Sequence, residues 1–140
     1  MTIEEILEDF ALLDDWEDRY RYVIELGKKL DPLPEPERTP RNKVRGCASQ
    51  VWLSTTVIRD QASPHLTFRG DSDAHIVRGL VAIVLALFDN KTPAEILNTD
   101  AEAVFRQIGL SDHLTAQRSN GLRALVDRIR ADADALHATT

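Results

Sequence analysis

The chain has 140 residues, which corresponds to one domain, and its formal net charge at pH 7 is −6. Its hydrophobic fraction of 43% is enough to form a core and argues against a disordered chain. Because the chain is acidic overall, we expect neither general nucleic-acid binding nor docking on anionic lipid.

The single cysteine, Cys47, limits the sites that the chain could build. One thiol can form neither an internal disulfide nor a metal cage of several cysteines, so we expect no metal site. A lone thiol is typical of a reducing compartment. The N-terminus lacks the pattern of a secretory signal, and the longest apolar run, residues 76–88, is shorter than the ~20 residues of a membrane span. The sequence therefore predicts a cytoplasmic protein without a membrane partner.

Helical periodicity predicts two helices at the start of the chain. The first covers residues 3–13 behind a capping box at Thr2, and the second begins after Asp14 or Asp15 and extends to Leu30. Residues 31–40 hold four of the six prolines, which predicts an extended connector.

The middle of the chain has the character of a β-hairpin. Residues 51–58 are rich in β-branched and aromatic side chains, residues 65–69 alternate as a return strand, and 60–64 form the turn. A short segment at 42–45 is a candidate third strand, which would place Gly46 and Cys47 in the bend between strands.

Helices return in the second half. Ser72 or Asp73 is expected to cap an apolar helix over 74–88. Capping boxes are expected at Thr92 to Glu95 and at Thr99 to Glu102, a helix stop at Gly109, and a last helix over 116–136. The predicted fold class is therefore α+β, with a small antiparallel sheet packed against helices.

Cys47 is the main candidate for chemistry. A lone cysteine is most often a small buried hydrophobic residue. Cys47, however, follows Lys43, Arg45 and Gly46, which places it at a loop tip beside cations that favour the nucleophilic thiolate. A reactive thiol and an inert packed thiol are the two hypotheses.

The segment Gly46-Cys47-Ala48-Ser49-Gln50-Val51-Trp52 resembles the sequence around the active cysteine of the SufE family of sulfur acceptors. Further segments resemble the family in the expected order: residues 16–20, 24–27, 70–73, 76–80, 92–93 and 114–121. The resemblance covers nearly the whole chain. It implies a single SufE-like domain over residues 1–140 with a two-layer sandwich similar to that of the IscU scaffold.

The resemblance also implies a mechanism. Cys47 would take a persulfide sulfur from a pyridoxal-phosphate-dependent cysteine desulfurase of the SufS or CsdA type, stimulate that enzyme, and deliver the sulfur to an iron–sulfur cluster scaffold. The pyridoxal phosphate belongs to the desulfurase, so no cofactor is expected on this chain. The family allows a homodimer. The lack of a second thiol fits a carrier, because the sulfur cannot be lost to an internal disulfide.

Six further residues are expected to support Cys47 or bind the partner: Gly46, Ser49, Gln50, Arg45, Asp73 and Arg118. Arg118 lies near the start of the last helix, where a cation opposes the helix dipole. We therefore expect it to contact the desulfurase or border the thiol. Asp71 and Asp73 are more simply caps than catalytic carboxylates, and the basic segment 38–45 is expected to meet an acidic protein surface.

Two other functions are compatible with the sequence. A stand-alone hydrolase with a cysteine nucleophile needs a base near Cys47, and such a dyad with one of the histidines, His65, His75, His113 or His137, would form only in space. A regulatory adaptor would need no reactive thiol. For a carrier, we expect the Cys47 loop to tuck inward in the free protein and to swing out at Gly46 on docking.

Overall fold

The computed structural model describes residues 1–47, 49–59 and 62–139. Its sheet is an antiparallel pair, β1 (Val51–Ile58) and β2 (His65–Ser72), with Val51 opposite Ser72 and Ile58 opposite His65. Strand alternation places Leu53 and its partner Gly70 on the same face, toward the core. The hairpin that the β-branched residues predicted is therefore present.

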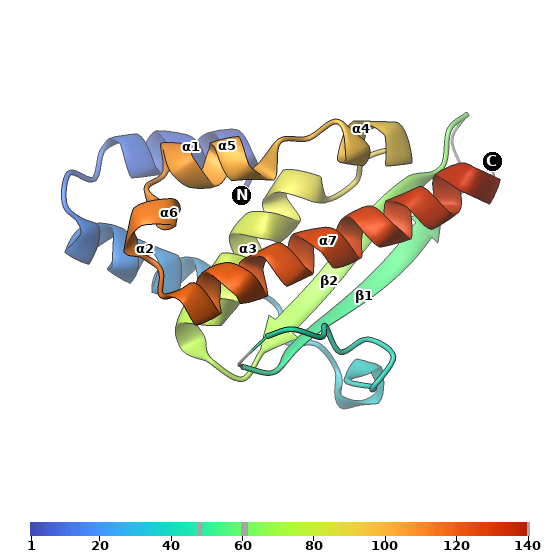
Figure 1. Ribbon diagram of the computed structural model, residues 1–140, viewed down its shortest axis with the longest axis horizontal. Coiled ribbons are helices and arrows are strands. Elements are labelled where there is room, and N and C mark those ends of the chain that lie inside the picture. The colour runs from blue at the N-terminus through green and yellow to red at the C-terminus, as the bar shows by residue number, and fades with distance from the viewer. Residues whose placement is uncertain (48, 60–61, 140) are drawn as a thin grey trace.

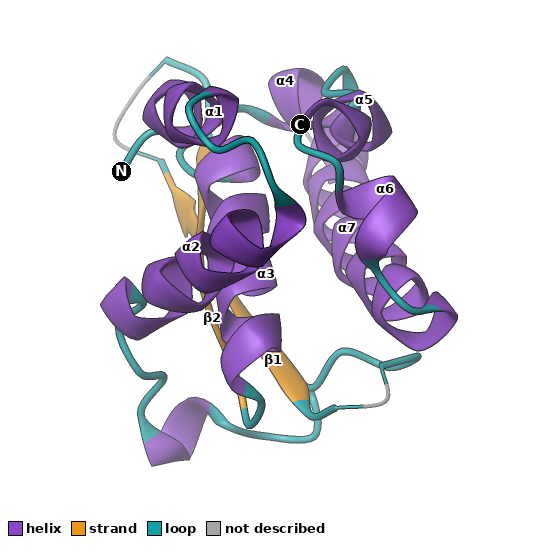
Figure 2. Cartoon of the chain, turned by 90° about the vertical axis from the view of Figure 1, so that its left-hand side faces the viewer, coloured by secondary structure: helices purple, strands orange, loops and turns teal. Residues whose placement is uncertain are grey.

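The helices of the described chain are α1 (Ile3–Ala11), α2 (Trp16–Lys29), α3 (His75–Phe88), α4 (Pro93–Leu97), α5 (Ala101–Gln107), α6 (Leu110–His113) and α7 (Ala116–Thr139), with a 3-10 turn η1 at Glu35–Glu37. Figure 1 shows the helices above the hairpin and the connector with η1 below it. The central helix α3 packs against α2, β2 and α7. Figure 2 shows α2 and α3 side by side in front of the strands. The α+β prediction is confirmed.

Side-chain caps explain where several helices begin. Thr2 accepts a hydrogen bond from the Glu5 backbone, and Asp15 accepts one from Asp18, as the sequence predicted. Thr92 and Glu95 form a complete capping box before α4, and Gly109 has the left-handed φ of 81° expected of a helix stop. Among the described residues, no helix combines the length and apolarity needed to cross a membrane.

Several boundaries differ from the predictions. The first helix ends at Ala11, and β2 continues past Arg69 to Ser72. The candidate strand at 42–45 is reduced to a single bridge between Lys43 and Trp52 on the edge of β1. Of the predicted turn at 60–64, residues 60–61 lie outside the described part.

Two caps are also placed differently. The helix α3 begins after Ala74 without a side-chain cap, so neither Ser72 nor Asp73 caps it. Before α5, the cap is Asp100, which accepts a hydrogen bond from Ala103, instead of Thr99. The one-turn helix α6 had no counterpart among the predicted elements.

Candidate functional site

The Cys47 loop folds back against the last helix. Just before it, the Val44 backbone N–H donates to the Val51 carbonyl at 2.8 Å. Gly46 has a φ of 90°, which L side chains rarely adopt. Gly46 also lies so close to α7 that an added Cβ would be 3.4 Å from the Ala124 Cβ. A glycine therefore lets the chain turn tightly beside the helix.

The thiol is half-buried and contacts α7. The Cys47 Sγ–H donates to the carbonyl oxygen of Gly121 at 3.5 Å. At Gly121 the helix presents its backbone to the sulfur, and an added Cβ there would lie 3.5 Å from Cys47 Sγ, an ordinary contact distance. The thiol is therefore tucked inward in this conformation, as expected for the free protein.

Cys47 lines a cavity of about 260 Å³ between its loop, β1, α3 and α7. The apolar part of the lining is Val51, Val77, Leu80, Val81, Leu122 and Leu125. The polar part is Ser49, Thr115, Gln117 and Arg118. The cavity is therefore a largely apolar compartment, and Arg118 is the cation among the described residues of its wall.

Burial changes the acid–base balance of the Cys47 thiol. Desolvation raises the pKa of Cys47, because a buried thiolate loses hydration that a neutral thiol does not need. The expectation that Lys43 and Arg45 would favour the thiolate is wrong in this conformation: both side chains are exposed and neither lines the cavity. Burial therefore favours the neutral thiol over the thiolate in this conformation.

Arg118 reaches the cavity from the first turn of α7. Its backbone N–H donates to the Thr115 hydroxyl at 3.2 Å, which fixes the start of the helix. The sequence expectation that Arg118 borders the Cys47 site agrees with this position, and Ser49 lines the same cavity.

Gln50, Asp73 and Arg45 lie outside the cavity lining. The Gln50 backbone N–H donates to the Asp73 carboxylate at 3.0 Å, and the Asp73 N–H donates to the Gln50 carbonyl at 3.3 Å. These bonds attach the end of the Cys47 loop to the end of β2. Asp73 is therefore a loop anchor, and the expectation that it caps a helix is wrong.

Asp71 is neither a cap nor a catalytic group at the cavity. Its side chain is fully buried and pairs with Arg38 at 2.7 Å and with Arg78 at 3.2 Å. It also accepts the Leu33 backbone N–H at 2.9 Å. The carboxylate therefore holds the connector to the sheet and to α3.

No histidine is found among the described residues that line the cavity. His113 stacks on Trp16 at 4.4 Å between ring centroids, and His65 Nδ1 contacts the Ser63 carbonyl at 2.8 Å. Over the described ranges, no group of three or more His, Cys, Asp or Glu side chains could hold a metal ion.

Reasoning from the sequence alone missed Gly121, Thr115 and Gln117 as neighbours of the thiol. All three residues belong to segment 114–121, which resembles the SufE family, and this resemblance is the feature of the sequence that could have pointed to them. The apolar wall from α3 carried no such signal, because Val77 and Leu80 have the pattern of ordinary core residues.

Known proteins resemble this chain in sequence and in fold. A SufE-like protein of Rhizobium meliloti is 59% identical over 133 residues, covering 95% of both chains. One of Rhizobium etli is 60% identical over 132 residues, covering 94% of this chain and 89% of the other. The solution structure of a hypothetical protein from Thermus thermophilus shares the fold, with a TM-score of 0.72 at 20% identity over 96% of each chain. A family model described as SufE, Fe-S metabolism associated domain, matches residues 4–133, and the chain therefore belongs to the SufE family.

Proposed function

We propose that this protein accepts sulfur on Cys47 from a cysteine desulfurase and carries it as a persulfide to iron–sulfur cluster assembly. The observation that carries the proposal is the lone thiol at the wall of a largely apolar cavity that Arg118 also lines. Membership of a family associated with Fe-S metabolism supports it. The pyridoxal phosphate of the reaction belongs to the desulfurase.

The transfer step is a thiol–persulfide exchange. The Cys47 thiol loses its proton and the thiolate attacks the outer sulfur of the persulfide on the desulfurase cysteine. A sulfur–sulfur bond to Cys47 forms while the sulfur–sulfur bond in the desulfurase breaks. The desulfurase cysteine leaves with the electron pair as a thiolate and takes up a proton, so no external oxidant or reductant is needed.

The cavity suits the product of this step. Its volume of about 260 Å³ leaves room for one additional sulfur atom beside Cys47. Apolar walls limit access of other thiols to the carried sulfur, and the Arg118 charge favours the anionic persulfide.

A stand-alone hydrolase is the weaker candidate. The described lining of the cavity contains no histidine, aspartate or glutamate that could act as a base for Cys47. The third candidate, a regulatory adaptor with an inert thiol, differs from the carrier in one measurable outcome, the addition of sulfur to Cys47.

The decisive experiment incubates the protein with its desulfurase and free cysteine and follows the intact mass. We expect one added sulfur on the wild type, none on Cys47→Ser, and loss of the stimulated turnover in that variant. An unmodified Cys47 with full stimulation would establish the adaptor and refute the carrier.

Arg118 has a matched control in Arg123, an exposed arginine of the same helix that does not line the cavity. We expect Arg118→Ala to slow sulfur transfer about tenfold, as the loss of one charge-assisted contact predicts. Arg123→Ala should leave the rate unchanged, and equal rates for the two variants would remove Arg118 from the site.

A further inference from the structure

Positive charge is concentrated beside the thiol of an otherwise acidic chain. Residues 38–59 include five Lys and Arg residues and no Asp or Glu, whereas the whole chain has a net charge of −6. The cations nearest to Cys47 in sequence are Arg41, Lys43 and Arg45. This local excess opposes the charge of the rest of the molecule.

Only part of this charge is used inside the fold. Arg38 pairs with the buried Asp71 and lies over the Trp52 ring, 5.0 Å from its centroid. In contrast, the side chains of Arg41, Lys43 and Arg45 are exposed, and within the described part of the chain none of them forms an ion pair. Their charge is therefore available to a partner.

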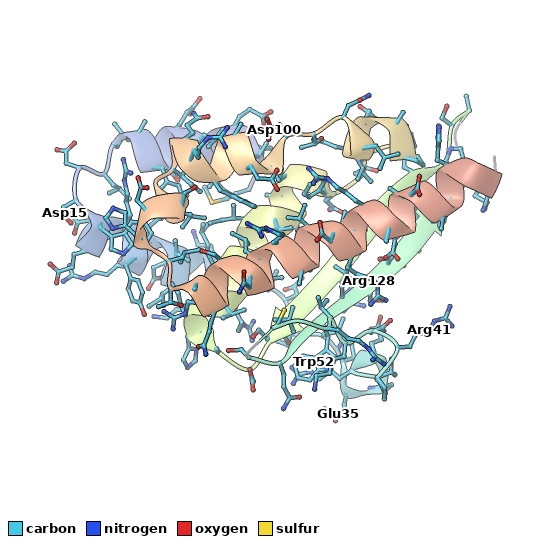
Figure 3. All side chains as sticks on the ribbon, viewed as in Figure 1. Asp15, Glu35, Arg41, Trp52, Asp100 and Arg128 are labelled. Atoms are coloured by element: carbon cyan, nitrogen blue, oxygen red, sulfur yellow. The ribbon has the colours of Figure 1, made fainter. Side chains whose placement is uncertain are left out.

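The three cations line an open groove of about 530 Å³ between residues 40–45 and α7, which we call the basic groove. The described residues that line it are Pro40, Arg41, Lys43, Val44, Arg45, Ala124, Asp127 and Arg128. Figure 3 shows Arg41 and Arg128 on the same side of the molecule, where the connector approaches α7. Arg128 donates to the Arg41 carbonyl at 2.9 Å and pairs with Asp132 at 3.5 Å, which holds the connector in place.

The basic groove and the cavity are separated by the short segment of residues 45–47: Arg45 lines the groove and Cys47 lines the cavity. Gly46 packs on Ala124, which lines the groove, and Cys47 contacts Gly121, one turn earlier on α7. A protein that reaches the Cys47 sulfur must therefore approach within a few residues of Arg45.

We propose, on the basis of the function proposed above, that the basic groove docks an acidic surface segment of the desulfurase. Carboxylates of that segment pair with Arg41, Lys43 and Arg45 and set the partner over the Cys47 loop. Such complementary charge accelerates encounter and fixes orientation. A nucleic acid is a poorer occupant, because the described residues that line the groove include no aromatic ring to stack a base, and Asp127 would face the phosphates.

The test reverses the three charges together, as Arg41→Glu, Lys43→Glu and Arg45→Glu. The control reverses three exposed cations elsewhere, as Lys29→Glu, Arg106→Glu and Arg123→Glu, so that both variants have the same net charge. We expect the groove variant to raise the KM of the desulfurase for this protein at least about tenfold at low salt, with kcat at saturation within about twofold. The control should stay within about twofold in both constants, and the salt dependence of KM should disappear only in the groove variant.

A second variant with glutamine at the same three positions removes charge without repulsion and should raise KM by a smaller factor. If KM is unchanged in both groove variants while Cys47 still takes sulfur, the inference is overturned and the proposed function stands. If the wild type takes no sulfur, the proposed function fails. Calorimetric titration of the wild type and the groove variant with the desulfurase then tests the inference, because it measures binding without sulfur transfer. The inference would also be overturned if a short labelled RNA bound the wild type but not the groove variant, while the KM of the desulfurase was the same for both.

Discussion

Burial in the fold disfavours the thiolate form of Cys47, which is the nucleophile. The raised pKa means that the fold stabilises the neutral thiol more than the thiolate. This contribution to stability is fully present below the pKa of the thiol in the unfolded chain, about 8.5, and is lost as pH rises from there through the higher pKa of the folded protein.

We therefore predict that alkylation of native Cys47 by iodoacetamide is slow at pH 8 and increases with a midpoint above that of the urea-unfolded chain. Mass spectrometry of quenched samples measures both rates, and Cys47→Ser gives the blank. A native midpoint at or below the unfolded one would mean that the thiol is exposed, or that a cation such as Arg118 outweighs desolvation.

At the scale of the elements, the glycines of α2, α3 and α7 differ in how closely other atoms surround them. The helices α2 and α3 touch through their backbones: a Cβ on Gly27 would lie 2.7 Å from the Gly79 nitrogen, and one on Gly79 would overlap the Val23 carbonyl. On α7, a Cβ on Gly121 would meet the Cys47 Sγ at 3.5 Å, an ordinary contact.

We predict that Gly79→Ala lowers the free energy of unfolding by about 3 kcal/mol or more, because the helices must separate. Gly121→Ala should raise it by roughly 0.5–1 kcal/mol, since alanine has less conformational entropy to lose in a helix. Urea denaturation measures both. Similar losses in the two variants would contradict the close approach of α2 and α3.

Elements whose ends depend on local chemistry were predictable from the sequence. Thr2, Asp15 and Thr92 each lie at the spacing from the helix that a side-chain cap requires, and each caps as expected. At α5 two residues compete: Thr99 has the spacing of a capping box to Glu102, but the adjacent Asp100 makes the bond to Ala103. Spacing alone does not decide between neighbouring acceptors.

Features that depend on tertiary contacts could not be predicted in this way. The segment at 42–45 has strand character, but only Lys43 reaches a bridge with Trp52, because the connector turns away along α7. Likewise, the meeting of Cys47 with Gly121 and Arg118 joins parts far apart in sequence. Only the resemblance to a family related these segments before the structure did.

At the scale of the whole molecule, one buried carboxylate connects three separate parts. Asp71 lies in β2, Arg78 in α3 and Arg38 in the connector that leads to the Cys47 loop. Asp71 is fully buried, whereas the Arg38 and Arg78 side chains keep 28% and 21% of their exposure. A buried charge is tolerated only while its partners remain, so the three parts depend on one another.

We predict that Asp71→Asn lowers the free energy of unfolding by about 3 kcal/mol, near the low end for a broken buried pair because both arginines can reach water. Asparagine keeps the shape and can still accept the Leu33 N–H, so the loss isolates the charge. Asp134→Asn, at an exposed position of α7, is the control and should change stability by less than about 0.5 kcal/mol. Hydrogen exchange should show residues 31–41 opening first in Asp71→Asn. Unchanged protection there, with stability within about 1 kcal/mol of the wild type, would mean that packing holds the connector without the ion pairs.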